Sequence, residues 1–490
     1  MPRAATPPLV LPALAPEERE PLQRQLYRHL RAAILDGRVG VGSRLPGSRS
    51  LAAHLGVSRN TVIAALDQLV AEGYVESRRG SGTTVAVPPV SLSAAAPVAT
   101  ADGAGQRAIS RQTRRLVSSE VPVSRGLLLA FAPGMPALDA FPSRDWSRIL
   151  ARRWRHPAPG LLGGHDAAGY PPLRSAIAEY LGRARGVRCS ADQVVVVAGS
   201  QQGLDLTARV LLDPGDQAMV EDPGYTGLRG VLRACGAVPV PVPVDDTGFD
   251  PGLAENLWPT ARLACVTPSH QFPSGATMPA DRRLALIAWA ARKDGWIVED
   301  DYDSDFRYAG RPLAALQGLD GGHRTIYCGT FSKSMFPALR LGWLVVPPDL
   351  LPAFLTMRRL ADVAPSTVTQ AAMADFMDEG LFTAHLRRMR ALYAERRQAL
   401  LASAARHLPG LAEVTAGEAG THAIAWLPAG WEDLAVAVAA QSQGLVPGAL
   451  GLYRLQPGRP GLILGYGNMP AETIDPAIRA LRQVLAHWSR

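Results

Sequence analysis

Apolar positions near the start of the chain recur every fourth residue. They are Leu22, Leu26, Leu30 and Ile34 in "LQRQLYRHLRAAILDG". This spacing places them on one face and predicts an amphipathic helix that ends at Gly37.

A pair of short helices is expected next. The first runs from Ser48 to Gly56, and the second takes Ser58 as its N-cap. The second helix carries its apolar residues on one face, namely Val62, Leu66, Leu69 and Val70. The "GVS" between them is the tight, glycine-containing turn of a helix-turn-helix. In the following "YVESRRGSGTTVAV", apolar and polar residues alternate on both sides of a Gly-Ser-Gly turn, which predicts a two-stranded wing.

The second helix of this pair begins with groups that can bind DNA. Its first turn offers hydroxyl, guanidinium and amide groups on Ser58, Arg59, Asn60 and Thr61. Arginines expected near DNA phosphates are Arg44, Arg49, Arg78 and Arg79. From spacing alone, the same bundle could be a protein-interaction or structural module.

The segment "LPGSRSLAAHLGVSRNTVIAALDQLVAEGYVESRRGSGTTV" resembles the DNA-binding domain of the GntR family over nearly its full length. The matching positions include Arg49, Arg59 and the wing residue Gly80. This resemblance implies double-stranded operator DNA as a partner.

Residues 88–125 are rich in Ala, Pro, Ser and Gly and lack sustained apolar periodicity. This composition favours a flexible linker. We therefore expect a mainly helical winged helix-turn-helix domain over residues 1–87, the linker over 88–125, and a large domain over 126–490.

In the large domain, runs typical of strands alternate with runs typical of helices. The expected strands are "QVVVVAG", "QAMVED", "LACVTPS", "WIVEDD", "TIYCGT" and "LGWLVVP". Helices are expected at "PPLRSAIAEYLGRARG" and "DRRLALIAWAARKDG". The alternation predicts an α/β domain with a mostly parallel sheet, in which ligands bind at the ends of the strands.

Polar motifs follow three of these expected strands. Gly199, Ser200 and Gln201 precede a helix and suit an anion such as phosphate, although any strand-turn-helix needs a small residue and a cap. "EDDYDSD" places five carboxylates within residues 299–305, and their mutual repulsion requires partners for some of them. A solvated acidic loop is the alternative, and a metal site is not expected because no histidine is interleaved.

"GTFSKSMFPALRLGW" supplies Thr330, Ser332, Lys333 and Arg340. Lys333 is one of only two lysines in the chain, and its neighbours are small, hydroxylated or apolar. Partial desolvation lowers the pKa of such a lysine and leaves its amine free to attack a carbonyl, although a structural ion pair is the alternative.

The order of these motifs resembles the fold-type I pyridoxal phosphate enzymes, specifically the class I aminotransferases, over nearly all of residues 126–490. Together with the GntR-like domain, the chain resembles the MocR/GabR family of transcriptional regulators. The resemblance implies pyridoxal 5'-phosphate as cofactor and a homodimer. It also implies that the aminotransferase-like domain senses the cofactor, an amine or an amino acid, with at most residual transamination.

The resemblance also implies roles for individual residues. Lys333 would form the Schiff base with the cofactor, Asp300 would pair with the pyridine nitrogen, and Tyr302 would reach the phenolic oxygen of the ring. Tyr225 would stack on the ring. Residues expected to hold the phosphate are Ser200, Gln201, Thr330, Ser332 and Arg340.

Three positions depart from the aminotransferase pattern. Phe272, preceded by His270 and Gln271, stands where an asparagine of an NPTG motif is usual. In "PGLILGYGN", Leu462 and Ile463 occupy the place of the arginine that grips a substrate carboxylate, with Arg454 and Arg459 as possible substitutes. Gly164 stands where relatives place a tyrosine that reaches the neighbouring subunit. The first two departures favour a regulator over a working aminotransferase, and the third puts one intersubunit contact in question.

Composition adds few constraints. The net charge of +8 fits DNA or phosphate as a partner but also fits an arginine-rich chain. The four cysteines are far apart and form no CxxC, so we expect reduced thiols. With no long apolar run or credible signal peptide, the sequence predicts a cytoplasmic protein. A cofactor-free domain that only dimerises is a third possibility.

Overall fold

The computed structural model describes residues 11–17, 20–78, 82–86, 109–118, 128–163, 166–308 and 314–488. The chain divides into two compact units, Met1–Ala108 and Ile109–Arg490. Arg79, Gly80 and Gly164, as well as the expected boundaries at residues 87/88 and 125/126, lie outside the described residues.

The N-terminal unit is a winged helix. It contains α1 (Leu22–Leu35), α2 (Ser48–Leu55), α3 (Arg59–Ala71) and an antiparallel hairpin of β1 (Val75–Arg78) and β2 (Gly82–Val85). Gly56 ends α2 in the left-handed region, at φ +65°. The core comprises Leu26, Leu30, Ile34, Leu51, Val62, Leu66, Leu69, Val75 and Val85, among others. These helices and the wing confirm the sequence interpretation.

One expected core residue of α3 was assigned wrongly. Val70 is 39% exposed, whereas Val62, Leu66 and Leu69 are buried. At 100° per residue, the position after Leu69 lies at the edge of the apolar stripe.

Part of the expected linker is helical. Arg111–Ser118 forms α4, and Gln112 Nε2 donates a hydrogen bond of 2.5 Å to the carbonyl of Ala234. The linker was expected because residues 88–125 as a whole are rich in Ala, Pro, Ser and Gly, yet this short part of them is helical and packs on α9 (Thr226–Ala234).

The C-terminal unit is built on an eight-stranded sheet with the strand order β3-β10-β9-β8-β7-β4-β5-β6. The strands are β3 (Val194–Val197), β4 (Gln217–Asp222), β5 (Val238–Asp245), β6 (Gly248–Phe249), β7 (Leu263–Val266), β8 (Trp296–Asp301), β9 (Thr325–Thr330) and β10 (Gly342–Val345). Only β6 and β10 run antiparallel to their neighbours, so the sheet is mostly parallel, as expected.

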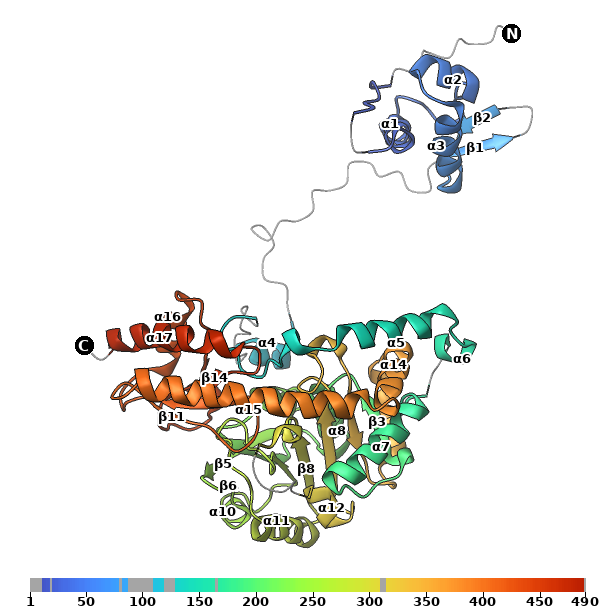
Figure 1. Cartoon of the computed structure of the whole chain (residues 1–490). Coiled ribbons are helices and arrows are strands. Elements are labelled where there is room, and N and C mark those ends of the chain that lie inside the picture. The colour runs from blue at the N-terminus through green and yellow to red at the C-terminus, as the bar shows by residue number, and fades with distance from the viewer. Residues whose placement is uncertain are drawn as a thin grey trace, which may run out of the picture. The chain divides into compact units, whose positions relative to one another are not determined.

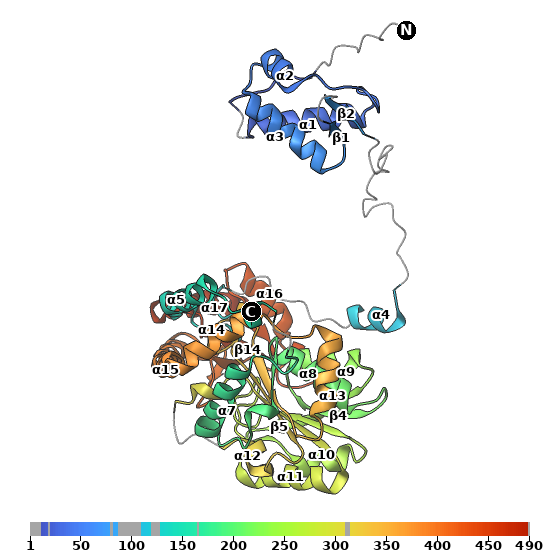
Figure 2. The same ribbon diagram turned by 90° about the vertical axis from the view of Figure 1, so that its right-hand side faces the viewer.

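Helices cover both faces of this sheet (Figures 1 and 2). One face packs on α8 (Ser200–Leu211), α9 and α13 (Leu351–Ala361). The other packs on α10 (Pro251–Leu257), α11 (Ala280–Lys293) and α12 (Leu316–Asp320), and α7 (Pro171–Arg185) contacts β3. Strand residues are buried on both sides, as in Val194–Val197.

A smaller antiparallel sheet has the order β11-β12-β14-β13. It consists of β11 (Glu413–Thr415), β12 (His422–Trp426), β13 (Gly448–Ala449) and β14 (Gly461–Gly465). The long helix α15 (Leu381–His407) extends from α14 (Thr367–Asp378) to this sheet, beside α17 (Ala471–Trp488) (Figure 1). The remaining helices are α5 (Ser143–Arg155), α6 (Pro159–Leu162) and α16 (Asp433–Gln441).

No helix in the described ranges is long and apolar enough to cross a membrane. The four cysteines are free, with Cys265 and Cys328 buried and the other two partly buried.

Candidate functional site

The motifs singled out in the sequence meet at one edge of the large sheet. Strands β3, β4, β7, β8 and β9 run in the same direction, so their carboxyl ends lie together. Gly199 follows β3, Tyr225 follows β4, and Tyr302 follows β8. In α/β folds this edge is where ligands bind.

The N-terminus of α8 is open to an anion. Gly199 caps it at φ +96°, and a Cβ there would lie 3.5 Å from Nη1 of Arg340. The Arg340 guanidinium therefore sits beside the first turn of α8, where Ser200 and Gln201 present main-chain N–H groups. Within the described part of the chain, Arg340 forms neither a hydrogen bond nor an ion pair through its side chain.

Thr330 and Ser332 lie on the loop that leads to Arg340. The Thr330 hydroxyl donates to Ser332 Oγ at 3.0 Å and accepts from the Ser332 main-chain N–H at 3.1 Å. Because β10 is paired between β3 and β9, this loop returns to the end of β3 and brings Arg340 to Gly199. Arg340 thus lies beside the residue that precedes Ser200 and Gln201, and Thr330 and Ser332 lie at the start of the same loop.

Tyr225 lies next to Gln201 and is 38% exposed. Its hydroxyl donates to Gln201 Oε1 at 2.8 Å, and Gln201 Nε2 donates to the carbonyl of Gly227 at 3.0 Å. A Cβ on Gly227 would lie 2.5 Å from the Tyr225 ring, so only glycine leaves room for the ring here. Burial, followed by the negative charge of Asp300, raises the pKa of Tyr225 to about 12.

Four of the five carboxylates in residues 299–305 have partners. Glu299 accepts main-chain N–H groups of Leu316 and Gln317, both at 2.9 Å. Asp301 pairs with Arg185 at 2.9 Å. Asp303 contacts His270, and Asp305 accepts a hydrogen bond from Tyr180. The prediction that repulsion demands partners is confirmed, and the segment is not a solvated loop.

Asp300 is the exception in this cluster. Its Oδ1 is buried and has no hydrogen-bond partner among the described residues. Burial raises the pKa of Asp300 to about 7, and the neighbouring Asp301, Glu221 and Asp303 act in the same direction while Lys333 opposes them. Asp300 as a whole is partly buried, and a buried carboxylate oxygen without a partner is costly and commonly marks a site that binds a donor.

Lys333 projects toward the segment after α4. Its Nζ donates to the carbonyl of Gly134 at 2.7 Å. Burial lowers the pKa of Lys333, as its apolar neighbours predicted, while Asp303 and Asp300 act in the opposite direction. The amine has no carboxylate within ion-pairing distance among the described residues, so the alternative of a structural ion pair is wrong.

A buried network links His270, Asp303 and Tyr302. His270 Nδ1 lies 3.0 Å from both carboxylate oxygens of Asp303 and 3.0 Å from the Tyr302 hydroxyl. His422 lies next to this network, with ring centroids 5.3 Å from His270. Burial, together with His270, lowers the pKa of His422 to about 3, so this imidazole is neutral near pH 7.

The position expected to carry a carboxylate-binding arginine lies in an apolar cluster. Ile463 of β14 is buried against Ile424 and Leu450, with Phe272 and Tyr453 packed on the cluster. A Cβ on Gly448 would lie 3.4 Å from Ile463, 3.5 Å from Tyr453 and 3.1 Å from Pro133, the residue before Gly134. The apolar cluster of Ile463, Phe272 and Tyr453, called the apolar wall below, therefore lies near the Gly134 carbonyl that accepts a hydrogen bond from Lys333.

Neither alternative arginine replaces the missing one. Arg459 pairs with Glu413 at 2.9 Å and stacks over the ring of Trp426. Arg454 lines a cavity of about 670 Å³ with Trp431, and none of the residues assigned to the cofactor lines that cavity.

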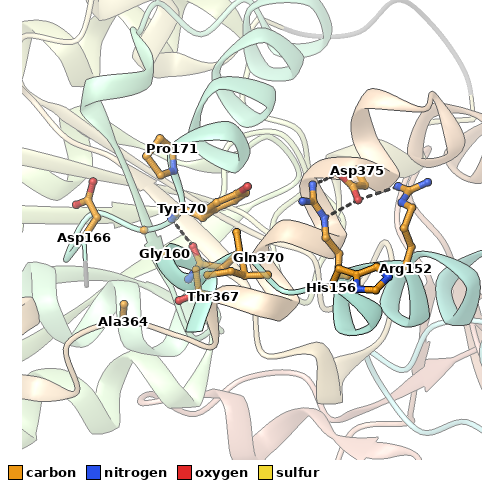
Figure 3. Close-up of a pocket in the computed structure, with 14 residues that line it drawn as sticks. Arg152, His156, Gly160, Asp166, Tyr170, Pro171, Ala364, Thr367, Gln370 and Asp375 are labelled. Atoms are coloured by element: carbon orange, nitrogen blue, oxygen red, sulfur yellow. Dashed lines mark hydrogen bonds and ion pairs between the residues drawn. The ribbon is translucent and has the colours of Figure 1, made fainter. Parts of the chain in front are cut away.

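A separate cavity of about 680 Å³ lies between α5, α6, α7 and α14 (Figure 3). Tyr170 and Gln370 meet in it, with the Tyr170 main-chain N–H donating to Gln370 Oε1 at 2.7 Å. Arg152 pairs with Asp375 at 2.8 Å on its far side. Asp166 and Gly169, which line the cavity, belong to the segment 163–169 in which relatives, unlike this chain, place a tyrosine that reaches the neighbouring subunit.

In the N-terminal unit, the described residues that were expected to contact DNA lie before α2, on α2, at the start of α3 and on the wing. Ser58 Oγ accepts from the main-chain N–H of Thr61 at 3.1 Å and contacts its hydroxyl at 2.8 Å, so these side chains cap the helix. Arg59 and Asn60 are exposed in the same turn. Arg49 is exposed too, and the Arg44 guanidinium packs against Gly82 of the wing.

Sequence reasoning missed two contacts of the site. The Gly134 carbonyl carries no side-chain signal, because any residue offers a carbonyl. His270 and Asp303, which pair with each other, belong to two different motifs of the sequence. The sequence showed only that each is a polar residue after one of two expected strands, and not that they meet. No group of three or more metal-ligating side chains occurs in the described portion of the structure.

Comparison with known proteins covers both units. Residues 22–85 match the model of the bacterial regulatory proteins of the gntR family, and residues 145–421 match aminotransferase class I and II. The chain is 44% identical over 464 residues to a probable rhizopine catabolism regulatory protein, MocR, of Rhizobium meliloti, covering 94% of this chain and 93% of the relative. It is 33% identical to the pyridoxine biosynthesis transcriptional regulator PdxR of Corynebacterium glutamicum, covering 97% of each.

Solved aminotransferases share the fold of the C-terminal unit. The kynurenine aminotransferase of Pyrococcus horikoshii superposes with a TM-score of 0.69 at 26% identity, covering 80% of this chain and 98% of that one. The α-aminoadipate aminotransferase LysN of Thermus thermophilus, complexed with a phosphopyridoxyl-leucine adduct, also gives 0.69, at 28% identity over 77% of this chain and 95% of that one.

Proposed function

Because the chain belongs to the MocR family of transcriptional regulators, with a GntR-type winged helix joined to an aminotransferase-like domain, we propose that it senses a ligand through bound pyridoxal phosphate. The winged helix binds operator DNA, and the state of the C-terminal unit changes its affinity. The observation that carries this proposal is the buried, unpaired Oδ1 of the partly buried Asp300, in the same site as Lys333 and the unpaired Arg340.

The residues of the site fit the cofactor at each of its polar groups. Asp300 Oδ1 needs a donor, and a protonated pyridine nitrogen supplies one. Arg340 and the open turn of α8 suit a phosphate dianion. When bound, pyridoxal phosphate supplies an aldehyde that condenses with primary amines and a ring that withdraws electrons. Lys333, whose pKa is lowered by burial, provides the amine of the chain.

DNA contacts follow from the surface of α3. Asn60 and Arg59 are exposed and can reach base edges, Arg59 through its terminal nitrogens because its Nε donates to Ser48 Oγ at 3.3 Å. Ser58 and Thr61 serve mainly to order the first turn. Arg44, Arg49 and Arg78 suit phosphates. Arg79 and Gly80 remain expectations from the sequence.

The effector is the cofactor itself or a primary amine that exchanges with Lys333. The wall formed by Ile463, Phe272 and Tyr453 offers no cation for a carboxylate, which disfavours simple α-amino acids. Relatives named for pyridoxine biosynthesis and for rhizopine catabolism agree with either a vitamer or a small metabolite as the signal. A ligand changes DNA affinity only if it binds one arrangement of the protein more tightly than another.

The regulator acts in the cytoplasm as a homodimer and does not turn over an amino donor at a significant rate. The cavity beside Tyr170 is lined by Asp166 and Gly169 of the segment in which relatives place a tyrosine that reaches the neighbouring subunit, and a second copy of the chain would cover it. Size-exclusion chromatography with light scattering tests this assembly directly. A monomer at micromolar concentration would contradict it.

The central test measures binding of the full chain to duplexes from its own upstream region. Wild-type protein with and without cofactor is compared with Lys333→Ala, across a panel of amines and amino acids. We expect the cofactor or an amine to change DNA affinity in the wild type, and amine effects to disappear in Lys333→Ala. Unchanged affinity under all conditions would refute the sensor, and absence of specific binding would refute the regulator.

An aminotransferase with an accessory DNA-binding domain is the second candidate, because its fold matches solved aminotransferases. It predicts steady turnover of an amino donor with a 2-oxo acid. Single-turnover conversion without multiple turnovers would support the sensor instead.

A further inference from the structure

His270 is buried in a slot that only glycines can line. A Cβ on Gly420 would lie 2.1 Å from His270 Cε1, and one on Gly417 or Gly275 would lie 3.2 or 3.3 Å from Nε2. The ring is 2% exposed, and Nε2 has no partner among the described residues. The chain therefore fixes this imidazole tightly while leaving one nitrogen unsatisfied, which indicates that its position serves Nδ1.

His270 Nδ1 faces the Asp303 carboxylate, which only accepts hydrogen bonds, and the Tyr302 hydroxyl, which can donate or accept. The Asp303 carboxylate, 3% exposed, can only accept hydrogen bonds, and both its oxygens lie 3.0 Å from Nδ1. Nδ1 must therefore carry the proton. Consequently, the Tyr302 hydroxyl at 3.0 Å can accept from Nδ1–H but cannot donate to it.

We propose that His270, locked by Asp303, is a positioning residue that directs the hydroxyl proton of Tyr302 away from itself and toward the ligand site. The hydroxyl forms no other hydrogen bond with the described residues. This inference rests on the proposed cofactor, whose ring oxygen is the acceptor that Tyr302 then serves. It assigns His270 a role toward the cofactor without direct contact.

The effect is measurable in the visible spectrum of the loaded protein. If the Tyr302 hydroxyl donates to an anionic oxygen on the cofactor ring, it stabilises the deprotonated form of the cofactor. Loss of this donor should therefore raise the pH at which half of the cofactor absorbance has changed, here called the midpoint. One hydrogen bond to a charged group corresponds to a shift of about one pH unit. The other ionisable groups around Tyr302 are Asp300, Asp301 and Glu221, and His422 and Lys333 lie near the network.

Two substitutions of His270 test separately whether Nδ1 or Nε2 of the imidazole is responsible for the effect. In His270→Asn the side-chain NH₂ can take the place of Nδ1–H, whereas in His270→Gln it reaches the place of Nε2. We expect a midpoint close to wild type in the Asn variant and an upward shift of about one unit in the Gln variant. Asp303→Asn, which lets Nδ1 lose its proton, should shift the midpoint like His270→Gln.

Tyr302→Phe provides the second arm of the test. It should shift the midpoint by itself, and adding His270→Gln should then shift it no further. Equal shifts in the Asn and Gln variants, or a further shift in the Tyr302→Phe background, would overturn the proposal. A wild-type protein that binds no cofactor would instead refute the proposed function, so the two failures are distinguishable.

Discussion

Replacing Asp300 with asparagine should stabilise the cofactor-free protein while weakening cofactor binding. Burial raises the pKa of this carboxyl from 3.8 to about 7. Between these values the unfolded chain releases the proton while the folded chain keeps it, so stability falls as pH rises from about 4 to about 7. The destabilisation caused by the Asp300 carboxylate is therefore fully present above about pH 7 and absent below about pH 4.

The shift of roughly three pKa units corresponds to about 4 kcal/mol as an upper limit at pH 8. At pH 5, where the folded carboxyl is still protonated, the same linkage gives about 2 kcal/mol. Asp300→Asn removes this cost at either pH, so its gain over wild type should be larger at pH 8. Loss of a charged partner for the pyridine nitrogen should weaken cofactor affinity roughly 10- to 100-fold.

Denaturant unfolding followed by tryptophan fluorescence measures this effect in the full chain, because every tryptophan lies at residue 146 or beyond and reports on the C-terminal unit alone. Asp301→Asn is the matched control. It breaks the buried pair with Arg185 and should destabilise the unit by about 3 to 5 kcal/mol. The reasoning is refuted if Asp300→Asn is no more stable than wild type at pH 8, or if its gain is equal at both pH values.

Other substitutions test the anion site, the apolar wall and the DNA-binding unit. Arg340→Gln should lower cofactor affinity roughly 10-fold or more in equilibrium titrations, yet leave the unfolding free energy nearly unchanged because no carboxylate loses a partner. Ile463→Ala should cost about 2 to 5 kcal/mol in the fluorescence assay, since the side chain is fully buried. Ser58→Ala should lower the free energy of unfolding of the N-terminal unit by about 1 kcal/mol, measured from its unfolding transition by circular dichroism. Arg59→Gln should leave that transition unchanged and weaken duplex binding, measured by fluorescence anisotropy. The control Arg38→Gln, which replaces an exposed arginine paired with Asp36, should change neither the transition nor duplex binding.

Local patterns were sufficient for the winged helix. Caps such as Ser58 and Gly56 determine where the helices begin and end, and these signals depend on neighbouring residues only. The core assignment of Val70 was wrong because this residue lies at the edge of the apolar stripe of α3, where spacing alone does not decide between burial and exposure.

In the large unit, strands and motifs were predictable but their partners were not. The sequence indicated that some acidic residues in 299–305 need partners, yet the distinction between Asp300 and Asp301 depends on Arg185, more than a hundred residues away. Strand β5 was also missed, since its "VPVPVPVD" contains prolines at alternate positions. The main-chain N–H of Val238 donates to Asp216, just before β4. The prolines alternate with the valines, so the N–H groups that they lack would point away from β4, which suits a strand near the edge of the sheet.

The loop between β9 and β10 carries both Lys333 and Arg340. Its two ends are fixed, because Thr330 pairs with Gly342 and a Cβ on Gly342 would lie 2.7 Å from the Gly329 carbonyl and 3.0 Å from Gly199 Cα. Insertion or deletion of one residue in this loop would change the reach of the amine relative to the guanidinium. Substitutions in the walls of the site can therefore change which ligand fits, whereas a change in the length of this loop would separate the amine of Lys333 from the anion site.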